Sequence, residues 1–597
     1  MPFRLLLLGV VIVLLSPQVY AVTLWAGSSC TLTTIQAAVD AAAASGDSDN
    51  VIHLIANESY PERVQVAGLN VTVEGASAGC GSLFNVVGAT STFEGAGGAD
   101  TSLLTISGNS TVVLGDVVFE NAHALSGIGA GGGINFVGSG SLTLINVAVI
   151  LNTAIGGGGI NADAEGGTLD VFINEGTQIL NNTAQSASGG GVQLFGATTL
   201  HMVEPDTWIA LNHAPNGYGG GLHIVAPATA LVGSPGFHGA PALYANRAAY
   251  GGGAAVMGSS TCPDLSHARL FLYTTDPENP IRVSDNVATV SGGGVYLLPE
   301  DDGHPLCDAE LNAHDFVIED NLASEGAGMT LDEATAQGFV DHGSSALLNV
   351  GARPTGAVGC GVDVRCNEIS GNVDEDQNGQ ATLGATIFVG TSSILQADAL
   401  AMHHNIANFL MHAAGDNDLE GGISLHNCLT GGNNIARELI KMDGDDNPVV
   451  IDQCTLAPDI INSQYVIRFD NTSGNVLTIS NTIIDEPGTL SLFNPGIDLF
   501  VDYVLTNDTS TLPTQVDVVL GEPDYVDLAS GDYHQTATSL GVDFAPAAGG
   551  VDLDGNPRDV DLPVANFFGA RDLGAYETQR TFSCGAADTI FCDGFEL

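Results

Sequence analysis

The chain has 597 residues and a formal net charge of −55, because 68 residues are Asp or Glu and only 13 are Lys or Arg. Such an acidic surface repels phosphate backbones, which excludes nucleic acid as a partner, yet it can hold divalent cations or simply keep the protein soluble. With 44% hydrophobic residues the chain is too apolar for disorder, so its 77 glycines indicate a repeat protein.

Residues 1–21 have the pattern of a secretory signal peptide. Arg4 precedes an apolar run from Leu5 to Leu15, and residues 19–21 offer a small-residue cleavage site. The run is shorter than the roughly 20 apolar residues of a membrane-spanning helix. We expect the mature chain to begin near Val22, to carry no transmembrane segment, and to be secreted or held at the cell surface.

The ten cysteines fit an oxidising compartment. In a solenoid each coil touches only the next, so cysteines that are neighbours in sequence are expected to pair. The C-x-x-C spacing typical of zinc sites is missing from the sequence. Neighbour pairing predicts five disulfides: Cys30 with Cys80, Cys262 with Cys307, Cys360 with Cys366, Cys428 with Cys454, and Cys584 with Cys592.

Residues 22–100 are expected to form an N-terminal cap and the first coils. The segment 33–36 reads Thr-Thr-Ile-Gln, which is a capping box, and Gly46 ends the helical pattern. Because a solenoid exposes unpaired strand edges at its ends, we expect this helix to cover the first coil. One face of the predicted helix is apolar and contains Ile35, Ala38, Val39 and Ala42.

Residues 101–500 are predicted to be β-helix repeats. Each copy has an Asn, often an Ala two positions later, then a cluster of glycines and a new apolar strand. Apolar and polar residues alternate between these marks, as in Ser141, Leu142, Thr143 and Leu144, so the coils are β rather than helical. The expected corner asparagines are Asn152, Asn182, Asn212, Asn246, Asn286 and Asn321, and degenerate copies of the mark follow at Asn405 and Asn434.

An asparagine that recurs at one corner can stack on the next and donate from its amide to a neighbouring carbonyl. We also expect these asparagines to take the left-handed backbone of the sharp turn, and the glycines to supply positive φ angles after it. Both are structural roles. A row of ligand-binding amides is the alternative, which the routine use of Asn and Gly in turns disfavours.

The repeats resemble those of polymorphic outer-membrane proteins. The closest copies are Phe119-Glu120-Asn121 and Gly132-Gly133-Ile134, and the similarity covers roughly residues 100–440. The segment 34–66 is similar to the opening of pectin-lyase-like β-helices. These resemblances imply an all-β, right-handed parallel β-helix with a short N-terminal capping helix, secreted or displayed on a bacterial surface.

Residues 501–580 are expected to be a closing segment. Asp524-Tyr525-Val526-Asp527, a Val-Asp-Leu-Asp-Gly-Asn-Pro-Arg run at 551–558 and Asp572-Leu573-Gly574-Ala575-Tyr576-Glu577 resemble the end of choice-of-anchor β-helix proteins. Residues 581–597 are expected to form a tail with two cysteines, and the last ten residues, 588–597, resemble a C-terminal signature of secreted proteins from some Gram-negative bacteria.

One segment resembles a calcium loop. Asp374, Asp376 and Asn378 place oxygens at positions one, three and five, and Gly379 stands at position six. Position twelve is Ala385 instead of the usual Glu, so the match is partial. The sequence predicts calcium as the one cofactor, with a solvated acidic loop as the alternative.

Two functions remain open. The first is a non-catalytic, secreted or surface-displayed scaffold for adhesion or cell-envelope contact, with an extracellular glycan or a cell surface as its partner. The second is a divergent carbohydrate-active enzyme, either a polysaccharide lyase or a glycoside hydrolase acting on acidic polysaccharide. The Arg-x-Pro-x-x-Arg and Gly-His-Gly motifs of such enzymes are missing from the sequence, which favours the scaffold.

Overall fold

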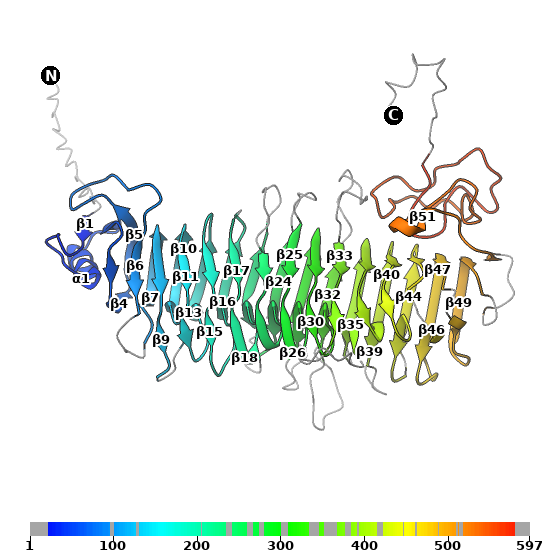
Figure 1. Ribbon diagram of the computed structural model, residues 1–597, viewed down its shortest axis with the longest axis horizontal. Helices are drawn as coiled ribbons and strands as arrows, with labels where there is room; N and C mark the ends of the chain where they lie inside the picture. The colour runs from blue at the N-terminus through cyan, green and yellow to red at the C-terminus, as the bar shows by residue number, and fades with distance from the viewer. Residues whose placement is uncertain are drawn as a thin grey trace, which may run out of the picture.

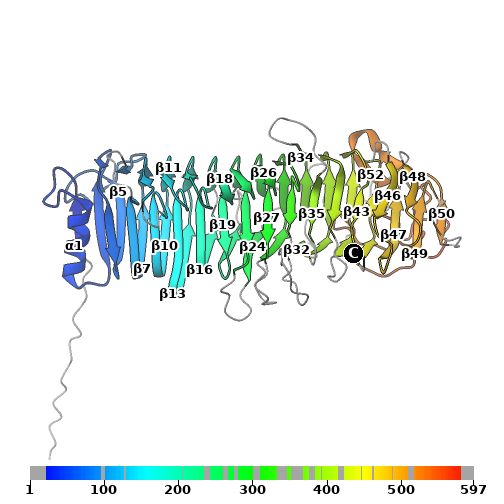
Figure 2. The ribbon, with the colours of Figure 1, turned by 90° about the horizontal axis from the view of Figure 1, so that it is seen from below.

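The computed structural model describes residues 22–579, except for 96–100, 127–129, 205, 234–241, 260–266, 274–279, 300–308, 333–345, 351–366, 376–383, 391–392, 415–421, 446, 460–462, 487–488, 509–511 and 513–516. The chain is a right-handed parallel β-helix, as the sequence predicts, and forms a rod with helix α1 at one end (Figures 1 and 2). No helix of the described part has the length and apolar composition needed to cross a membrane.

Each coil contributes strands to three parallel rows, which we call the long, middle and short rows. The long row begins with β1 (Thr23–Ala26), β2 (Asn50–Ile55), β4 (Val64–Ala67), β5 (Asn70–Ser77), β7 (Leu104–Gly115), β10 (Ile134–Ile145), β13 (Ile160–Ile173) and β16 (Val192–Met202). It continues with paired shorter strands: β19 (Leu222–Val225) and β20 (Thr229–Val232), β23 (Ala254–Met257) and β24 (Ala268–Tyr273), β27 (Val295–Leu298) and β28 (Ala309–His314), β31 (Met329–Leu331) and β32 (Ala346–Val350), β35 (Ala385–Val389) and β36 (Ile394–Asp398), β39 (Phe409–Ala413) and β40 (Gly422–His426), β43 (Ile440–Met442) and β44 (Pro448–Asp452). It ends with β46 (Ser463–Phe469), β47 (Val476–Ile484), β48 (Thr489–Phe493) and β49 (Asp498–Thr506).

The middle and short rows consist of shorter strands. The middle row contains β3 (Ser59–Tyr60), β6 (Ser91–Glu94), β8 (Val117–Glu120), β11 (Ala148–Ile150), β14 (Gln178–Leu180), β17 (Trp208–Ala210), β21 (Ala242–Tyr244), β25 (Ile281–Ser284), β29 (Phe316–Glu319), β33 (Asn367–Ser370), β37 (Leu400–His403), β41 (Leu429–Gly431), β45 (Thr455–Leu456) and β50 (Val518–Leu520). The short row contains β9 (His123–Ala124), β12 (Thr153–Ala154), β15 (Thr183–Ala184), β18 (His213–Tyr218), β22 (Arg247–Tyr250), β26 (Val287–Ser291), β30 (Leu322–Ala323), β34 (Val373–Asp374), β38 (Ile406–Ala407) and β42 (Asn434–Ile435).

The core runs along the inside of the rod. Phe119, Val149, Ile179 and Ile209 occupy the same inward position in successive strands of the middle row, and all four are fully buried. Burying a side chain of this kind contributes roughly 1.5–3 kcal/mol to folding, so the repeated inward positions account for much of the stability. The in-register stacking explains why apolar residues recur once per coil.

The N-terminal helix forms as predicted. Helix α1 (Ile35–Ser45) buries Ile35, Ala38, Val39 and Ala42, the apolar face identified from the sequence. The side chain of Thr34 accepts a hydrogen bond from the backbone N–H of Ala37, and Gly46 ends the helix in the left-handed conformation. The helix packs against β1, β2 and β4 and so covers the first coil.

The corner between the middle and short rows carries a continuous ladder of buried asparagines. The Nδ2 group of Asn182 donates to Oδ1 of Asn212 at 3.0 Å and to the carbonyl of Val149 in the preceding coil at 2.8 Å. The same two bonds recur from Asn152 to Asn321. The ladder continues through Asn405, which the sequence marks as a degenerate copy, and through two asparagines not predicted from the sequence, Asn372 and Asn433.

The left-handed residue at this corner is the one before each ladder asparagine. Leu151, Asn181 and Leu211 have φ angles of 56°, 55° and 58°. The expectation that the ladder asparagines themselves take this conformation is therefore wrong. The asparagine supplies the hydrogen bonds, and its predecessor makes the turn.

The glycine clusters have two separate tasks. Gly189 opens its cluster with a φ of 72°, as expected of a turn glycine. Gly191 lies against the ladder, where a Cβ atom would stand 2.6 Å from the carbonyl oxygen of Gly221 and 2.8 Å from Nδ2 of Asn212. Any side chain at this position would push the coils apart.

Parallel pairing continues to Leu520, so the β-helix extends past residue 500, where the sequence placed the start of the closing segment. The segment after it does not form another coil. It contains the hairpin of β51 (Tyr525–Asp527) and β52 (Asp532–Gln535), with a 3-10 turn over Leu528–Ser530, and packs beside the last coils (Figure 1).

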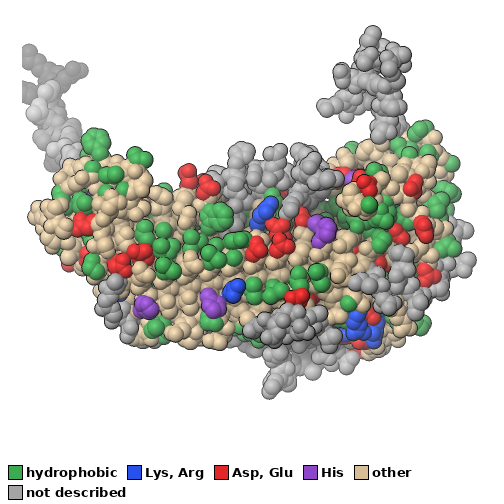
Figure 3. All heavy atoms as spheres, in the orientation of Figure 1, with side chains coloured by type: hydrophobic (Ala, Val, Ile, Leu, Met, Phe, Trp, Pro, Cys, Tyr) green, Lys and Arg blue, Asp and Glu red, His purple; other side chains and the backbone are tan. Residues whose placement is uncertain are grey.

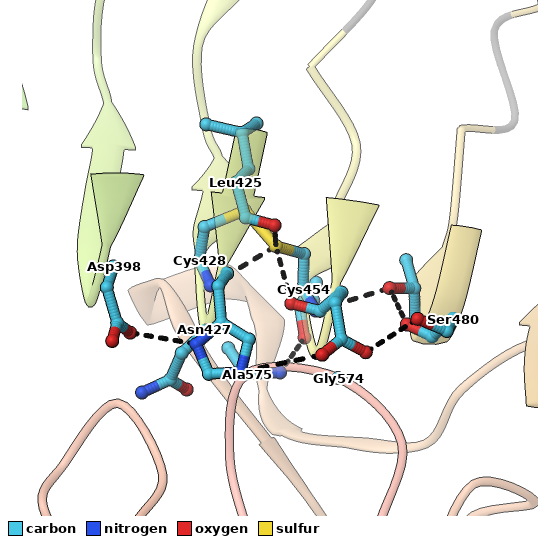
Figure 4. The surroundings of a disulfide bond; sticks show 12 residues. Asp398, Leu425, Asn427, Cys428, Cys454, Ser480, Gly574 and Ala575 are labelled. Carbon is cyan, nitrogen blue, oxygen red and sulfur yellow. Dashed lines mark hydrogen bonds and ion pairs between the residues drawn. A yellow bond between two sulfur atoms is a disulfide. The ribbon is translucent and has the colours of Figure 1, made fainter. Parts of the chain in front are cut away.

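A buried arginine joins the closing segment to the side of the rod. The guanidinium of Arg558 donates to Oδ1 of Asn427 at 2.7 Å and to the carbonyls of Gly574 and Ala575 at 3.0 and 2.9 Å. The backbone N–H of Ala575 in turn donates to the hydroxyl of Thr455. The contact lies next to the disulfide between Cys428 and Cys454 (Figure 4).

Two of the five expected disulfides fall on described residues, and both are confirmed. Cys30 bonds to Cys80, and Cys428 bonds to Cys454 in the next coil. The other expected partners lie outside the described residues: Cys262, Cys307, Cys360, Cys366, Cys584 and Cys592.

Candidate functional site

The middle row has an outer face without charge over four successive coils. The strands β11, β14, β17 and β21 have three residues each, and none of these residues is Asp, Glu, Lys or Arg. Apolar side chains gather on the surface over this part of the rod (Figure 3). We call the outward side of these four strands the neutral face.

Two aromatic side chains dominate the neutral face. Trp208 is 43% exposed and Tyr244 is 38% exposed. Trp208 pairs with Ala242, and Ala210 pairs with Tyr244, so the two rings lie on adjacent strands two positions apart. Exposed aromatic side chains gathered with other apolar residues are typical of a contact surface. Two further exposed apolar side chains at its corner are Leu151 and Leu211.

Charged side chains limit the neutral face at both ends. Glu120 stands on β8, one coil before it, and neighbouring Glu94 helps to raise the pKa of Glu120, although burial is the larger cause. One coil after it, Nη1 of Arg282 lies 3.1 Å from Oε1 of Glu319. Figure 3 shows a group of acidic side chains beside the apolar area, nearer the middle of the rod. The neutral face is therefore a bounded area.

Two outward carboxylates beyond the neutral face, nearer the middle of the rod, are candidates for catalysis. Glu319 and Glu368 point outward from adjacent strands, two positions apart in register. Glu368 accepts a hydrogen bond from the hydroxyl of Ser370 at 2.6 Å and lies 3.2 Å from Nε2 of His403. Its side chain is 7% exposed, and Glu319 pairs with Arg282. Both carboxylates are thus held by partners within the protein.

A second aromatic group lies between the short and long rows. The rings of Tyr218 and Tyr250 are 5.0 Å apart, and those of Tyr250 and Tyr296 are 5.2 Å apart. The hydroxyl of Tyr296 donates to Asp332. Beneath them, burial lowers the pKa of His223 to about 3, so this histidine is neutral. The three tyrosine rings stack on one another over the buried, neutral His223, which is typical of structural packing at a corner of the coils.

The single lysine of the sequence belongs to an ion-pair network. Nζ of Lys441 lies 2.7 Å from Oδ1 of Asp443 and 3.4 Å from Oδ2 of Asp470. Arg468 also pairs with Asp470, at 2.6 Å, and His412 with Asp443, at 2.8 Å. Lys and Arg side chains are seen together on the lower side of the rod in Figure 3. Since each of these cations faces a carboxylate, the network offers no excess positive charge to an anion.

The asparagine ladder ends in two acids. The backbone N–H of Asn433 donates to Oδ1 of Asp459 at 2.8 Å, and the N–H of Asp459 donates to Oε2 of Glu486 at 3.1 Å. Asp459 thus takes the place of a ladder amide in its coil. Burial raises its pKa to about 6. Tyr525 and Tyr533 of the closing hairpin lie close enough for these acids to contribute to raising their pKa values, after burial itself.

The calcium prediction falls partly outside the described residues, because Asp376 and Asn378 lie there. Asp374 is 2% exposed in β34, and its Oδ1 accepts a hydrogen bond from the N–H of Ala327 at 3.2 Å. Burial raises its pKa well above the usual value. Within the described ranges no three His, Cys, Asp or Glu side chains converge as a metal site requires. Calcium binding at 374–378 stays a prediction.

The chain matches no protein-family model and no curated protein. Trp208 and Tyr244 are not among the site residues predicted from the sequence, although one signal was available. Both residues sit at outward positions of strands that follow the repeat, where polar residues are expected on a solvated face.

Proposed function

We propose that this protein is a secreted or surface-displayed, non-catalytic β-helix scaffold of bacterial origin, related to the polymorphic outer-membrane repeats, that attaches to an extracellular surface through its neutral face. The observation that carries this proposal is the neutral face itself. In a chain with a net charge of −55, four successive strands of the middle row carry exposed aromatic side chains and no charged residue. Exposed apolar areas bounded by polar residues are typical of interaction sites.

The surroundings of the neutral face support a scaffold over an enzyme. A glycoside hydrolase needs two carboxyl groups that reach the substrate, one as acid and the other as base or nucleophile, and the Glu368 side chain is only 7% exposed. Glu368 is held by Ser370 and His403, and Glu319 by Arg282. The backbone of the face is fixed on both sides by neighbouring coils, which suits a rigid contact surface.

The test is retention on a surface. Residues 22–597 are coupled to fluorescent beads, which are passed over bacterial cell-envelope preparations and over immobilised polysaccharides. We expect retention that Trp208→Ala and Tyr244→Ala together reduce by at least about tenfold, since each stacked ring contributes on the order of 1 kcal/mol. Phe500→Ala is the matched control, because Phe500 is also an exposed aromatic residue, 60% exposed on β49.

Release of reducing or unsaturated ends from the polysaccharides is measured in the same samples. Product that disappears in Glu319→Gln or Glu368→Gln would support the enzyme instead. Retention that is equal in wild type and in the double variant would show that attachment uses another face.

A further inference from the structure

We infer that the neutral face binds an extended chain of neutral sugars, with Trp208 and Tyr244 as stacking platforms. This inference rests on the proposed function and names the ligand of the same face. It follows from three properties of the face, namely the spacing of its rings, its hydrogen-bonding groups and its charge.

The spacing of the coils suits a sugar chain. Adjacent parallel strands lie about 4.8 Å apart, which is close to the repeat of an extended β-linked glycan. Trp208 and Tyr244 are on adjacent strands and two positions apart in register, so a sugar chain that crosses the coils obliquely would meet both rings. A pyranose ring presents a face of C–H groups, and such a face stacks on an aromatic ring as other apolar groups do.

Amide side chains lie beside the rings. Gln178 pairs in register with Trp208 on the adjacent strand and is exposed, and Asn181 is exposed at the following corner. A primary amide carries two donors and one acceptor oxygen, so it can bond to a hydroxyl in either direction. Stacking rings flanked by amides fit sugar hydroxyls better than they fit a lipid surface, which offers no such groups within its apolar part.

Charge selects a neutral ligand. An acidic glycan or a second copy of this chain would bring more negative charge toward a protein of net charge −55. The strands of the face provide no cation, and Arg282 at its border is paired with Glu319. Arg247 is exposed on β22, but one positive charge offsets little of a net charge of −55. A neutral chain pays no such penalty.

The inference is tested by native gel electrophoresis of residues 22–597 in gels that contain hydroxyethylcellulose, glucomannan or polygalacturonate. We expect the protein to migrate more slowly in at least one of the two neutral gels, and to show no retardation in the polygalacturonate gel. Trp208→Ala and Tyr244→Ala should each weaken the retardation by about fivefold, Tyr244→Phe should retain it, and Phe500→Ala should match wild type. Circular dichroism melts confirm that each variant is folded.

Equal retardation of wild type and Trp208→Ala, retardation in polygalacturonate alone, or no retardation in either neutral gel would overturn the inference. Dimers that form through Trp208, seen by analytical ultracentrifugation, would assign the face to a second copy instead. If bead retention depends on Trp208 while both neutral gels fail, the glycan inference fails and the scaffold proposal stands. If the neutral gels succeed and the glycan is also cleaved, the scaffold proposal fails and the ligand assignment stands.

Discussion

At the scale of single residues, each ladder corner divides two tasks between neighbouring positions. The ladder asparagine stays in ordinary backbone and bonds to the coils on both sides, while the residue before it takes a positive φ. For a residue whose side chain makes no local hydrogen bond, the left-handed conformation lowers the free energy of unfolding by roughly 1–2 kcal/mol. Leu151 and Leu211 are in this position, and both are half exposed.

Replacing Leu151 with Asn should therefore stabilise the protein by about 1 kcal/mol, because Asn tolerates the left-handed conformation and little apolar burial is lost. The free energy of unfolding in guanidinium measures the change. Asn181→Leu is the mirror control, at the same corner one coil later, and should destabilise by a similar amount. If both substitutions lower stability equally, the backbone argument is wrong.

Asp459 gives a second residue-scale prediction. Asp459 occupies the position in its coil that Asn433 occupies in the preceding one. The Nδ2 group of Asn433 donates to the carbonyl of Met402, whereas Asp459 has a second carboxylate oxygen in place of that group. An ionised carboxylate has no hydrogen to donate, and Glu486, Tyr525 and Tyr533 face it from the neighbouring elements. Its folded pKa, about 6, lies above the ordinary value, so its contribution to stability is present at low pH and is lost as pH rises through 6.

Asp459→Asn should supply the missing donor at every pH. We expect it to raise the free energy of unfolding at pH 8 by on the order of 2 kcal/mol and to change it little at pH 4. Denaturant titrations at the two pH values measure this difference. Asn433→Asp is the control and should lower stability more at pH 8 than at pH 4. A gain for Asp459→Asn that is the same at both pH values would rule out the titration.

At the scale of elements, the periodic parts could be predicted and the packing of the ends could not. Helix α1 follows from a capping box and an apolar face, and the coils follow from period-two strands between Asn and Gly marks. The closing segment has neither a helical nor a strand periodicity. Its motifs therefore predicted roughly where it begins along the chain, but not which residues it contacts. Arg558 belonged to a recognised motif, yet its acceptor Asn427 lies 131 residues away in sequence.

The same separation explains the gaps in the site prediction. Trp208 and Tyr244 become neighbours only through strand register, which loops of variable length hide in the sequence. Two ladder asparagines after Asn321 are not predicted from the sequence. Asn372 follows a longer loop than the earlier copies do, and Asn433 stands next to Asn434, which the sequence pattern indicates as the mark of that coil.

The closing segment should depend on Arg558. Arg558→Met removes a guanidinium that serves several buried acceptors and leaves the carbonyls of Gly574 and Ala575 without it, at about 1–3 kcal/mol for each unmet group. We expect faster proteolysis between residues 522 and 579, with little change in the melting of the coils. Arg558→Lys should not restore protection. A single ammonium group cannot reach all the acceptors that the planar guanidinium contacts, which are Oδ1 of Asn427 and the carbonyls of Gly574 and Ala575. Unchanged proteolysis in both variants would contradict this docking role.

At the scale of the whole molecule, the chain forms one continuous acidic rod, held by its ladder and its apolar core, and we propose that it meets its partner through the neutral face. The hydrogen-bonded stack of coils fixes the position of that face. Binding should therefore protect the neutral face and leave the far end of the rod as accessible as before.

The most direct test is oxidative footprinting of residues 22–597, free and bound to the surface that retains the beads. We expect Trp208 and Tyr244 to be labelled in the free protein and protected in the bound protein, while Phe500 is labelled equally in both. Protection of Phe500 with continued labelling of Trp208 and Tyr244 would contradict the central claim.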